Sequence, residues 1–299
     1  MAAQKLIIDT DIGDDADDIL AIALALTYPQ VEIVGITTVF RNTELRAKLA
    51  QHLLALAGDV QIPVFPGAGN SLSTCNNTQD VPCQYTEEMA KYPVSGDAQS
   101  FYRKVFSKEK VNFVAIGCLT NLAIFIEENP HLVSNIGDVW IMGGCFRRHA
   151  NEWNIVCDPE AAHIVFNSGL TIRCIGLEIT SQCSLTTSDM DIMRLHANTP
   201  LKKLLIESCD HWFNKTGFLP VLHDPLVISA LIEQKDMGWE KEKVHVELNG
   251  TYTRGMTVCS DDHLWGREPT GANLLVATTV NSREFIEMYI NNVFISQVA

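Results

Sequence analysis

The sequence predicts a single α/β domain with a mainly parallel central sheet flanked by helices, and two observations carry this prediction. Short apolar, β-branched runs alternate with longer helical patterns, which is typical of βαβ units. The 299 residues contain no composition break, linker or repeat, so we expect one domain over residues 1–299. Right-handed crossovers place the carboxyl ends of parallel strands along one edge of the sheet, where open α/β sheets bind ligands.

The alternation is clearest in the first part of the chain. The expected strands are short runs rich in Ile and Val, and the second expected helix repeats leucine at helical spacing. In chain order we expect a strand at 6–8, a helix at 18–28, a strand at 31–39, a helix at 45–56, strands at 63–65 and 111–116, a helix at 122–128, a strand at 139–142, a helix at 161–166 and a strand at 170–177.

After Glu178 the pattern becomes more helical before it returns to strands. We expect helices at 188–196, 201–215 and 225–233, strands at 244–248, 256–258 and 274–280, and a last helix at 282–294. The earlier stretch 67–96 contains Pro, Ser, Asn and Thr, and it predicts a long loop near a site.

The bulk composition narrows the class of function. The net charge is −14, whereas nucleic-acid-binding proteins carry a basic surface, so polymeric DNA and RNA are not expected as partners. No apolar stretch is long enough to predict a membrane span. The nine cysteines include no C-x-x-C pair, and the first residues lack the apolar core of a signal peptide, so we expect a cytoplasmic protein.

The most informative segment is the acidic run that follows the first strand, with six aspartates within residues 9–18. Burying this much negative charge without a counter-charge is costly, and a hard divalent cation with oxygen ligands offsets several carboxylates at once. Asp17 and Asp18 also suit a helix N-terminus, where aspartate is favoured anyway, but this alternative does not explain Asp9 and Asp11.

The acidic run resembles the opening of the inosine–uridine-preferring nucleoside hydrolase family, in which D-x-D-P-G-x-D-D-A holds one calcium ion. Alignment on the following helix makes Asp17-Asp18 the family's paired aspartates, and Asp14-Asp15 is the competing register. Ile12 stands in place of the usual proline. Further segments resemble the family's motifs in order along the chain: 35–42, 116–121, 142–144, 152–154, 158–162, 223–225 and 254–258.

The resemblance implies a Rossmann-like nucleoside hydrolase fold and a homodimer or homotetramer that uses calcium and water to cut the N-glycosidic bond of a ribonucleoside. The transition state would resemble an oxocarbenium ion. Asp11 and His223 are the implied catalytic residues: Asp11 would act as general base, and His223 would protonate or hydrogen-bond the leaving nucleobase. The implied calcium ligands are Asp11, Asp18, the Thr120 carbonyl and Asp224. The implied substrate contacts are Asp17, Asn42, Glu152, Asn154 and Asp224.

Local patterns add three expectations around this site. An extended strand at 152–154 would place Glu152 and Asn154 on one side and direct Trp153 into packing. Asp158, which precedes a proline, is expected to cap a helix. Asp9 is expected to orient the acidic loop rather than to contact the metal.

Two motifs of the family are missing, and both concern specificity. Residues 93–97 lack the histidine of the H-G-x-x-G-L element, and residues 145–149 lack the asparagine that contacts the ribose 5′-hydroxyl. The preference for purine or pyrimidine is therefore open, with His211, Trp212 and Phe213 as candidates for contacts with the base.

Two alternative functions remain at this level. The first is a phosphatase of the haloacid-dehalogenase type, which also begins with a strand and D-x-D and would use Asp9 as nucleophile with magnesium. It leaves the later motifs of the chain unexplained. The second is a non-catalytic binder of nucleosides or ribose that keeps the metal site but has lost turnover.

Overall fold

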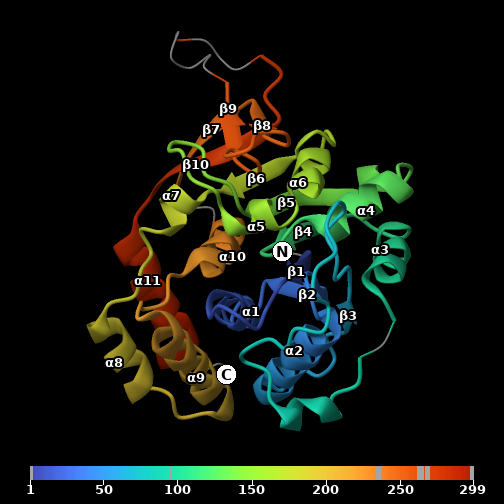
Figure 1. The fold of residues 1–299 in the computed structure, drawn as a ribbon. Coiled ribbons are helices and arrows are strands. Elements are labelled where there is room, and N and C mark those ends of the chain that lie inside the picture. Colours follow the sequence, from blue (N-terminus) through green and yellow to red (C-terminus); the bar gives the residue numbers. More distant parts are fainter. Residues whose placement is uncertain (1–2, 95, 234–236, 261–265, 267–269, 297–299) are drawn as a thin grey trace.

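The structure is a computed structural model that describes residues 3–94, 96–233, 237–260, 266 and 270–296. Its centre is an eight-stranded sheet in the order β3-β2-β1-β4-β5-β6-β10-β7 (Figure 1). Neighbouring strands are parallel except β10 and β7, which are antiparallel. The strands are β1 Gln4–Thr10, β2 Val31–Thr38, β3 Val64–Pro66, β4 Val111–Ala115, β5 Ile136–Met142, β6 Ile172–Ile175, β7 Met237–Glu242 and β10 Leu274–Val280, and a separate pair is formed by β8 Val244–Val246 and β9 Thr257–Cys259.

Helices connect the strands and cover both faces of the sheet (Figure 1). Several begin with a side-chain cap, as expected for Asp, Asn and Thr at this position. The α-helices are α1 Asp17–Leu26, α2 Thr43–Ala57, α3 Ala98–Phe106, α4 Thr120–Glu128, α5 Trp153–Cys157, α6 Pro159–Phe166, α7 Leu177–Thr180, α8 Thr187–Leu195, α9 Pro200–Thr216, α10 His223–Glu233 and α11 Ser282–Ile290. Short 3-10 turns are Glu87–Lys91 and Val133–Asn135, and α11 continues into the π-turn Asn291–Ile295.

The alternation of side chains along β1 explains why the sheet separates two apolar cores. Leu6 and Ile8 pack with α1, α2, α9, α10 and α11 on one face, whereas Ile7 packs with α3, α4 and α6 on the other. Because both faces of the central strands are covered, these strands consist of continuous apolar runs rather than alternating ones. None of the described helices has the length and apolar composition needed to cross a lipid bilayer.

The predicted α/β fold with a mainly parallel sheet is confirmed, with local corrections. The strand expected at 170–177 is limited to Ile172–Ile175 and is followed by α7. The stretch 67–96 is mostly loop but contains the short turn Glu87–Lys91. The expected elements do not include α3 or the antiparallel strand β7. The sequence of β7, MGWEKE, is too polar to stand out as a strand.

Candidate active site

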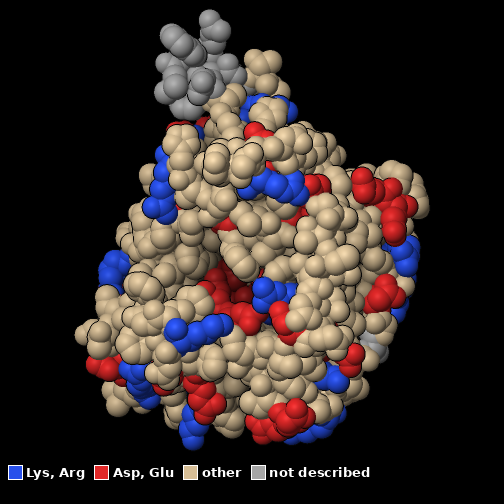
Figure 2. Space-filling view, in the orientation of Figure 1, with Lys and Arg blue, Asp and Glu red and all other residues tan. Residues whose placement is uncertain are grey.

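A cavity of about 540 Å³ opens at the carboxyl edge of the parallel strands, where the fold class predicts a ligand site. Its walls come from the segments after β1, β2, β4, β5 and β6, from the start of α10 and from the end of α9. Figure 2 shows this hollow, with acidic side chains on its floor and basic side chains beside it. The lining residues are Asp11, Asp14, Asp15, Asp17, Asp18, Phe40, Arg41, Ile116, Met142, Asn151, Glu152, Trp153, Asn154, Leu177, Trp212, Lys215, His223 and Asp224.

Three buried carboxylates form the acidic centre of the cavity. Asp17 and Asp18 begin α1, Asp224 lies in the first turn of α10, and one oxygen of each lies within 4.8 Å of the others. Burial, followed by the mutual repulsion of neighbouring aspartates, raises the pKa of all three side chains well above the ordinary value. No ion pair within the described residues neutralises them. This donor set of hard oxygens fits a divalent cation.

The geometry favours one of the two registers of the acidic run. Asp14 is engaged elsewhere, because its Oδ2 accepts from Nη2 of Arg46 at 2.7 Å. Asp15 lines the cavity, and its carboxylate accepts from the backbone N–H of Ala16. The pair that meets Asp224 is therefore Asp17-Asp18.

Asp11 follows the end of β1 and lines the cavity. Burial raises the pKa of its carboxyl to about 6, although the nearby Arg46 guanidinium opposes this shift. The turn after β4 packs directly against it: a Cβ atom on Gly117 would lie 2.9 Å from the backbone N and 3.0 Å from Oδ1 of Asp11. A side chain at Gly117 would therefore displace the carboxylate.

Arg46, a buried residue of α2, holds the loop that carries Asp11. Its guanidinium donates to the carbonyl oxygens of Asp11, Ile12 and Phe40, the last two at 2.8 and 2.9 Å. Phe40 and Arg41 have left-handed φ angles of 71° and 58°, an unfavourable conformation for non-glycine residues that is found mostly at functional sites. The guanidinium thus fixes two lining segments at once.

Asp9 lies beneath the cavity and does not line it. Its Oδ1 accepts from Thr37 Oγ1 at 2.6 Å, from Asn121 Nδ2 at 2.8 Å and from Tyr102 OH at 3.3 Å. Burial raises the pKa of this carboxyl to about 7. A fully buried carboxylate with these partners cannot meet a phosphate ester, which counts against the phosphatase alternative.

Glu152 and Asn154 both line the cavity, but the expected extended strand is wrong. The Glu152 carboxylate caps α5 by accepting the backbone N–H groups of Asn154 at 2.8 Å and Ile155 at 3.1 Å. Asn154 donates through Nδ2 to the carbonyls of Ile116 and Met142, both at 3.2 Å, which leaves its Oδ1 as an acceptor. Burial raises the pKa of Glu152 to about 7.

Trp153 lines the cavity instead of packing into the core, and this corrects the second part of the same expectation. Its side chain is 59% exposed, and its ring meets Phe40 edge to face with centroids 6.3 Å apart. The helical turn capped by Glu152 rotates Trp153 away from the position that strand alternation predicts.

His223 is the first residue of α10 and lines the cavity beside Asp224. Its Nδ1 lies 2.6 Å from the hydroxyl of Thr180. Burial lowers the pKa of the imidazole to about 4, so the ring is neutral near pH 7.

Two residues expected at the site do not line the cavity. Asn42 caps α2, with its Oδ1 accepting from the backbone N–H of Leu45 at 3.2 Å. Thr120 begins α4, and its hydroxyl donates to Asp158 at 2.6 Å. Asp158 caps α6, as expected.

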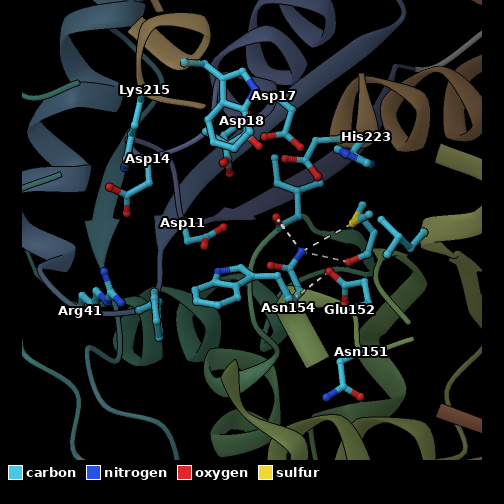
Figure 3. A pocket seen from close by; sticks show the side chains of 18 residues that line it. Asp11, Asp14, Asp17, Asp18, Arg41, Asn151, Glu152, Asn154, Lys215 and His223 are labelled. Atoms are coloured by element: carbon cyan, nitrogen blue, oxygen red, sulfur yellow. Dashed lines mark hydrogen bonds between the residues drawn. The ribbon is translucent and has the colours of Figure 1, made fainter. Parts of the chain in front are cut away.

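The structure also places at the cavity polar and aromatic residues to which the sequence analysis assigned no secure role. Trp212 lines it, whereas its neighbours His211 and Phe213 do not. Asn151, Arg41 and Lys215 also line it; Arg41 lies within the motif-like segment 35–42 without an expected role, and no motif marks Lys215. Figure 3 shows Lys215, Asp14 and Arg41 on one side of Asp11, with Glu152 and His223 on the other.

Comparisons with known proteins agree with this geometry. The sequence model of the inosine-uridine preferring nucleoside hydrolase family matches residues 6–287. A pyrimidine-specific ribonucleoside hydrolase of Salmonella gallinarum is 32% identical over 96% of this chain and 97% of its own length. A plant nucleoside hydrolase superposes with a TM-score of 0.86 at 26% identity, covering 98% of this chain and 99% of that one. A purine-preferring ribonucleoside hydrolase from Gardnerella vaginalis superposes with a TM-score of 0.83 at 25% identity, covering 97% and 98%.

Proposed function

We propose that this chain, which belongs to the inosine-uridine preferring nucleoside hydrolase family, requires a calcium ion held by its buried carboxylates. The reaction of this enzyme is hydrolysis of the N-glycosidic bond of ribonucleosides. The observation that carries the proposal is the cluster of Asp17, Asp18 and Asp224, which is buried and has no cationic partner in the described residues. Calcium accepts six to eight oxygen ligands with flexible geometry, as a crowded set of carboxylates provides.

The proposed calcium ligands are three carboxylates that line the cavity and one backbone carbonyl beside it. They are Asp11, Asp18, the carbonyl of Thr120 and Asp224. The contribution of Thr120 is supported by the close packing of the turn after β4 against Asp11, which Gly117 permits. The crowding of carboxylates supports the same assignment, because burial and neighbouring carboxylates raise the pKa of Asp11 and Asp18, and a bound cation would offset this repulsion and release their protons.

The bound cation would supply Lewis acidity that lowers the pKa of a nearby water molecule. Asp11 would take the proton of the attacking water as general base, and the water oxygen would bond to C1′ of the ribose as the C1′–N bond to the base breaks. Burial raises the pKa of this carboxyl above its ordinary value, which favours its accepting a proton.

The remaining acidic and amide groups hold the sugar. We assign Asp17, Glu152, Asn154 and Asp224 to the ribose hydroxyls, and the free Oδ1 of Asn154 is one such acceptor. Their negative field stabilises the positive charge that develops on the ribose as the bond to the base breaks. Neutral His223 contacts the base through the ring nitrogen that Thr180 does not engage.

We propose a cytoplasmic homodimer or homotetramer, because the family resemblance indicates such assemblies and all nine cysteines are free thiols, as in a reducing compartment. The base preference is open, because the relatives named above include both a pyrimidine-specific and a purine-preferring enzyme.

The test is release of ribose from inosine, adenosine, guanosine, uridine and cytidine, with and without a calcium chelator. Release that disappears on chelation and returns with added calcium supports the proposal, and the panel gives the base preference. Activity that persists unchanged after complete chelation contradicts the calcium requirement. Release of phosphate from a phosphomonoester with magnesium, and of ribose from no nucleoside, would instead support the phosphatase.

A further inference from the structure

Lys215 is a basic side chain of the cavity that the proposed reaction leaves without a role. It lies in the last turn of α9 and, with Arg41, is one of the two lysine or arginine residues among the described residues that line the cavity. Figure 3 shows Lys215 beside Asp14, across the cavity from Glu152 and His223. It therefore lies opposite Glu152, which is assigned to the sugar, and on the other side of the cavity from His223, the other residue assigned to the base.

The two basic side chains differ in how many of their interactions are with charged or aromatic partners. Arg41 forms an ion pair with Asp80 at 3.6 Å, and its guanidinium carbon lies 4.9 Å from the ring centroid of Phe40. Lys215 forms no ion pair within the described residues, and its Nζ donates to the Sγ of Cys83 at 3.2 Å. A thiol is a weak acceptor and an ammonium group has three N–H donors, so Lys215 retains hydrogen-bonding capacity at the cavity wall.

Breaking the glycosidic bond creates a charge that such a group can stabilise. The water oxygen bonds to C1′ and its proton passes to Asp11, while the electron pair of the C1′–N bond stays on the nitrogen of the base. The nucleobase then leaves as an anion unless a donor supplies a hydrogen bond or a proton. The carboxylates surround the end of this bond that becomes positive, so a cation is needed at the other end.

We propose that Lys215 stabilises the departing nucleobase by donating a hydrogen bond, and then its proton, to a ring nitrogen or carbonyl oxygen of the base. This inference rests on the proposed function. After the products leave, Lys215 regains a proton from water and Asp11 returns its proton to water. The net reaction consumes one water molecule and yields ribose and the neutral base.

The experiment compares two leaving groups in the Lys215→Met variant of the calcium-loaded full-length enzyme. Inosine and uridine need help from a donor, whereas p-nitrophenyl β-D-ribofuranoside releases an anion that is stable without protonation. We expect kcat/KM for the two nucleosides to fall on the order of 10²-fold, as for loss of a general acid, and kcat/KM for the p-nitrophenyl riboside to change little. Lys215→Arg, which retains the charge, should restore part of the loss.

Lys203→Met is the matched control, because Lys203 is an exposed lysine of the same helix that does not line the cavity. It should leave both substrates unaffected. Equal losses on both classes of substrate in Lys215→Met, or no loss on either, would overturn the inference while the hydrolase function stands. If the unmutated enzyme cleaves neither class, the proposed function fails and the inference fails with it.

Discussion

The two walls of the cavity are built in different ways. We define the carboxylate wall as Asp11, Asp17, Asp18, Glu152 and Asp224, and the base wall as Arg41, Trp153, Trp212 and Lys215. Apart from Asp11, which is half-buried, the carboxylate wall is buried and comes from helix starts and strand ends. The base wall is more exposed and comes from a loop, a short helix and the end of α9.

We infer from this difference that the carboxylate wall acts on the sugar and that the base wall recognises the base. Buried carboxylates held by neighbouring backbone and side chains are preorganised, so their charges act on the sugar without rearrangement. Exposed aromatic and basic side chains at element ends can change with little effect on the core, because few buried contacts depend on them. The attack on the ribose should therefore depend mainly on the first wall, and the departure and recognition of the base mainly on the second.

The largest effect is expected at the carboxylate wall. Asp11→Asn keeps the size of the side chain but removes the proton acceptor, so kcat should fall on the order of 10³-fold, within the range for loss of a general base. Steady-state kinetics on the best nucleoside of the panel measures this.

The control for this variant is Asp14→Asn in the same loop. This change removes the negative charge of Asp14, which pairs with Arg46, but leaves every proposed catalytic group in place. It should change kcat only severalfold. Nearly full activity in Asp11→Asn would contradict its role as base, and it would favour a site in which the cation and the ribose contacts suffice.

The acidic run and the family resemblance together named the residues of the carboxylate wall, although Glu152 was expected on an extended strand and instead caps α5. Six aspartates after a buried strand, followed by a helical pattern, already indicate Asp17-Asp18 as the helix start that the structure shows. The base wall could not be predicted in this way. Lys215 reaches the cavity only because α9 packs against α2, and Trp153 faces it only because Glu152 caps a helix. Neither depends on a local periodicity.

The second effect is on stability, and it tests whether the carboxylate wall requires a cation. The pKa of Asp11 is about 6 in the folded chain, above its ordinary value, so its contribution to stability is present below about pH 4 and is lost as the pH rises through 6. The pKa values of Asp17 and Asp18 are also raised above the ordinary value. In chelator, the melting temperature should therefore fall between about pH 5 and pH 8 through these groups.

Calcium should reverse this loss, because it binds the ionised carboxylates. At about a hundred times its Kd it would add roughly 2.7 kcal/mol at pH 8, or about 5–10 °C in melting temperature, and much less at pH 5. Differential scanning fluorimetry at both pH values measures the shift. An equal shift at the two pH values, or none at pH 8, would contradict a cation bound by carboxylates with raised pKa values.

A smaller effect is expected at the base wall. Trp153 is 59% exposed, so Trp153→Ala should not disturb the fold but should remove an aromatic face for the base. Stacking on one aromatic side chain contributes ~1–3 kcal/mol, and about 1.4 kcal/mol corresponds to a tenfold rise in KM with a smaller change in kcat. Trp153→Phe should retain most of the affinity. A large fall in kcat at unchanged KM would instead place Trp153 on the reacting side of the cavity.

The smallest effect concerns Asn42, which the family resemblance assigns to the ribose and the structure shows as the cap of α2. Asn42→Ala removes the cap and should cost about 1 kcal/mol of stability, whereas Asn42→Ser keeps a capping oxygen and should cost less. If capping is its main role, KM for the nucleoside stays within about twofold in the serine variant, a change of about 0.4 kcal/mol. A similar rise in KM in both variants would mean that the amide also contacts the ribose, and Asn42 would then belong with the carboxylate wall.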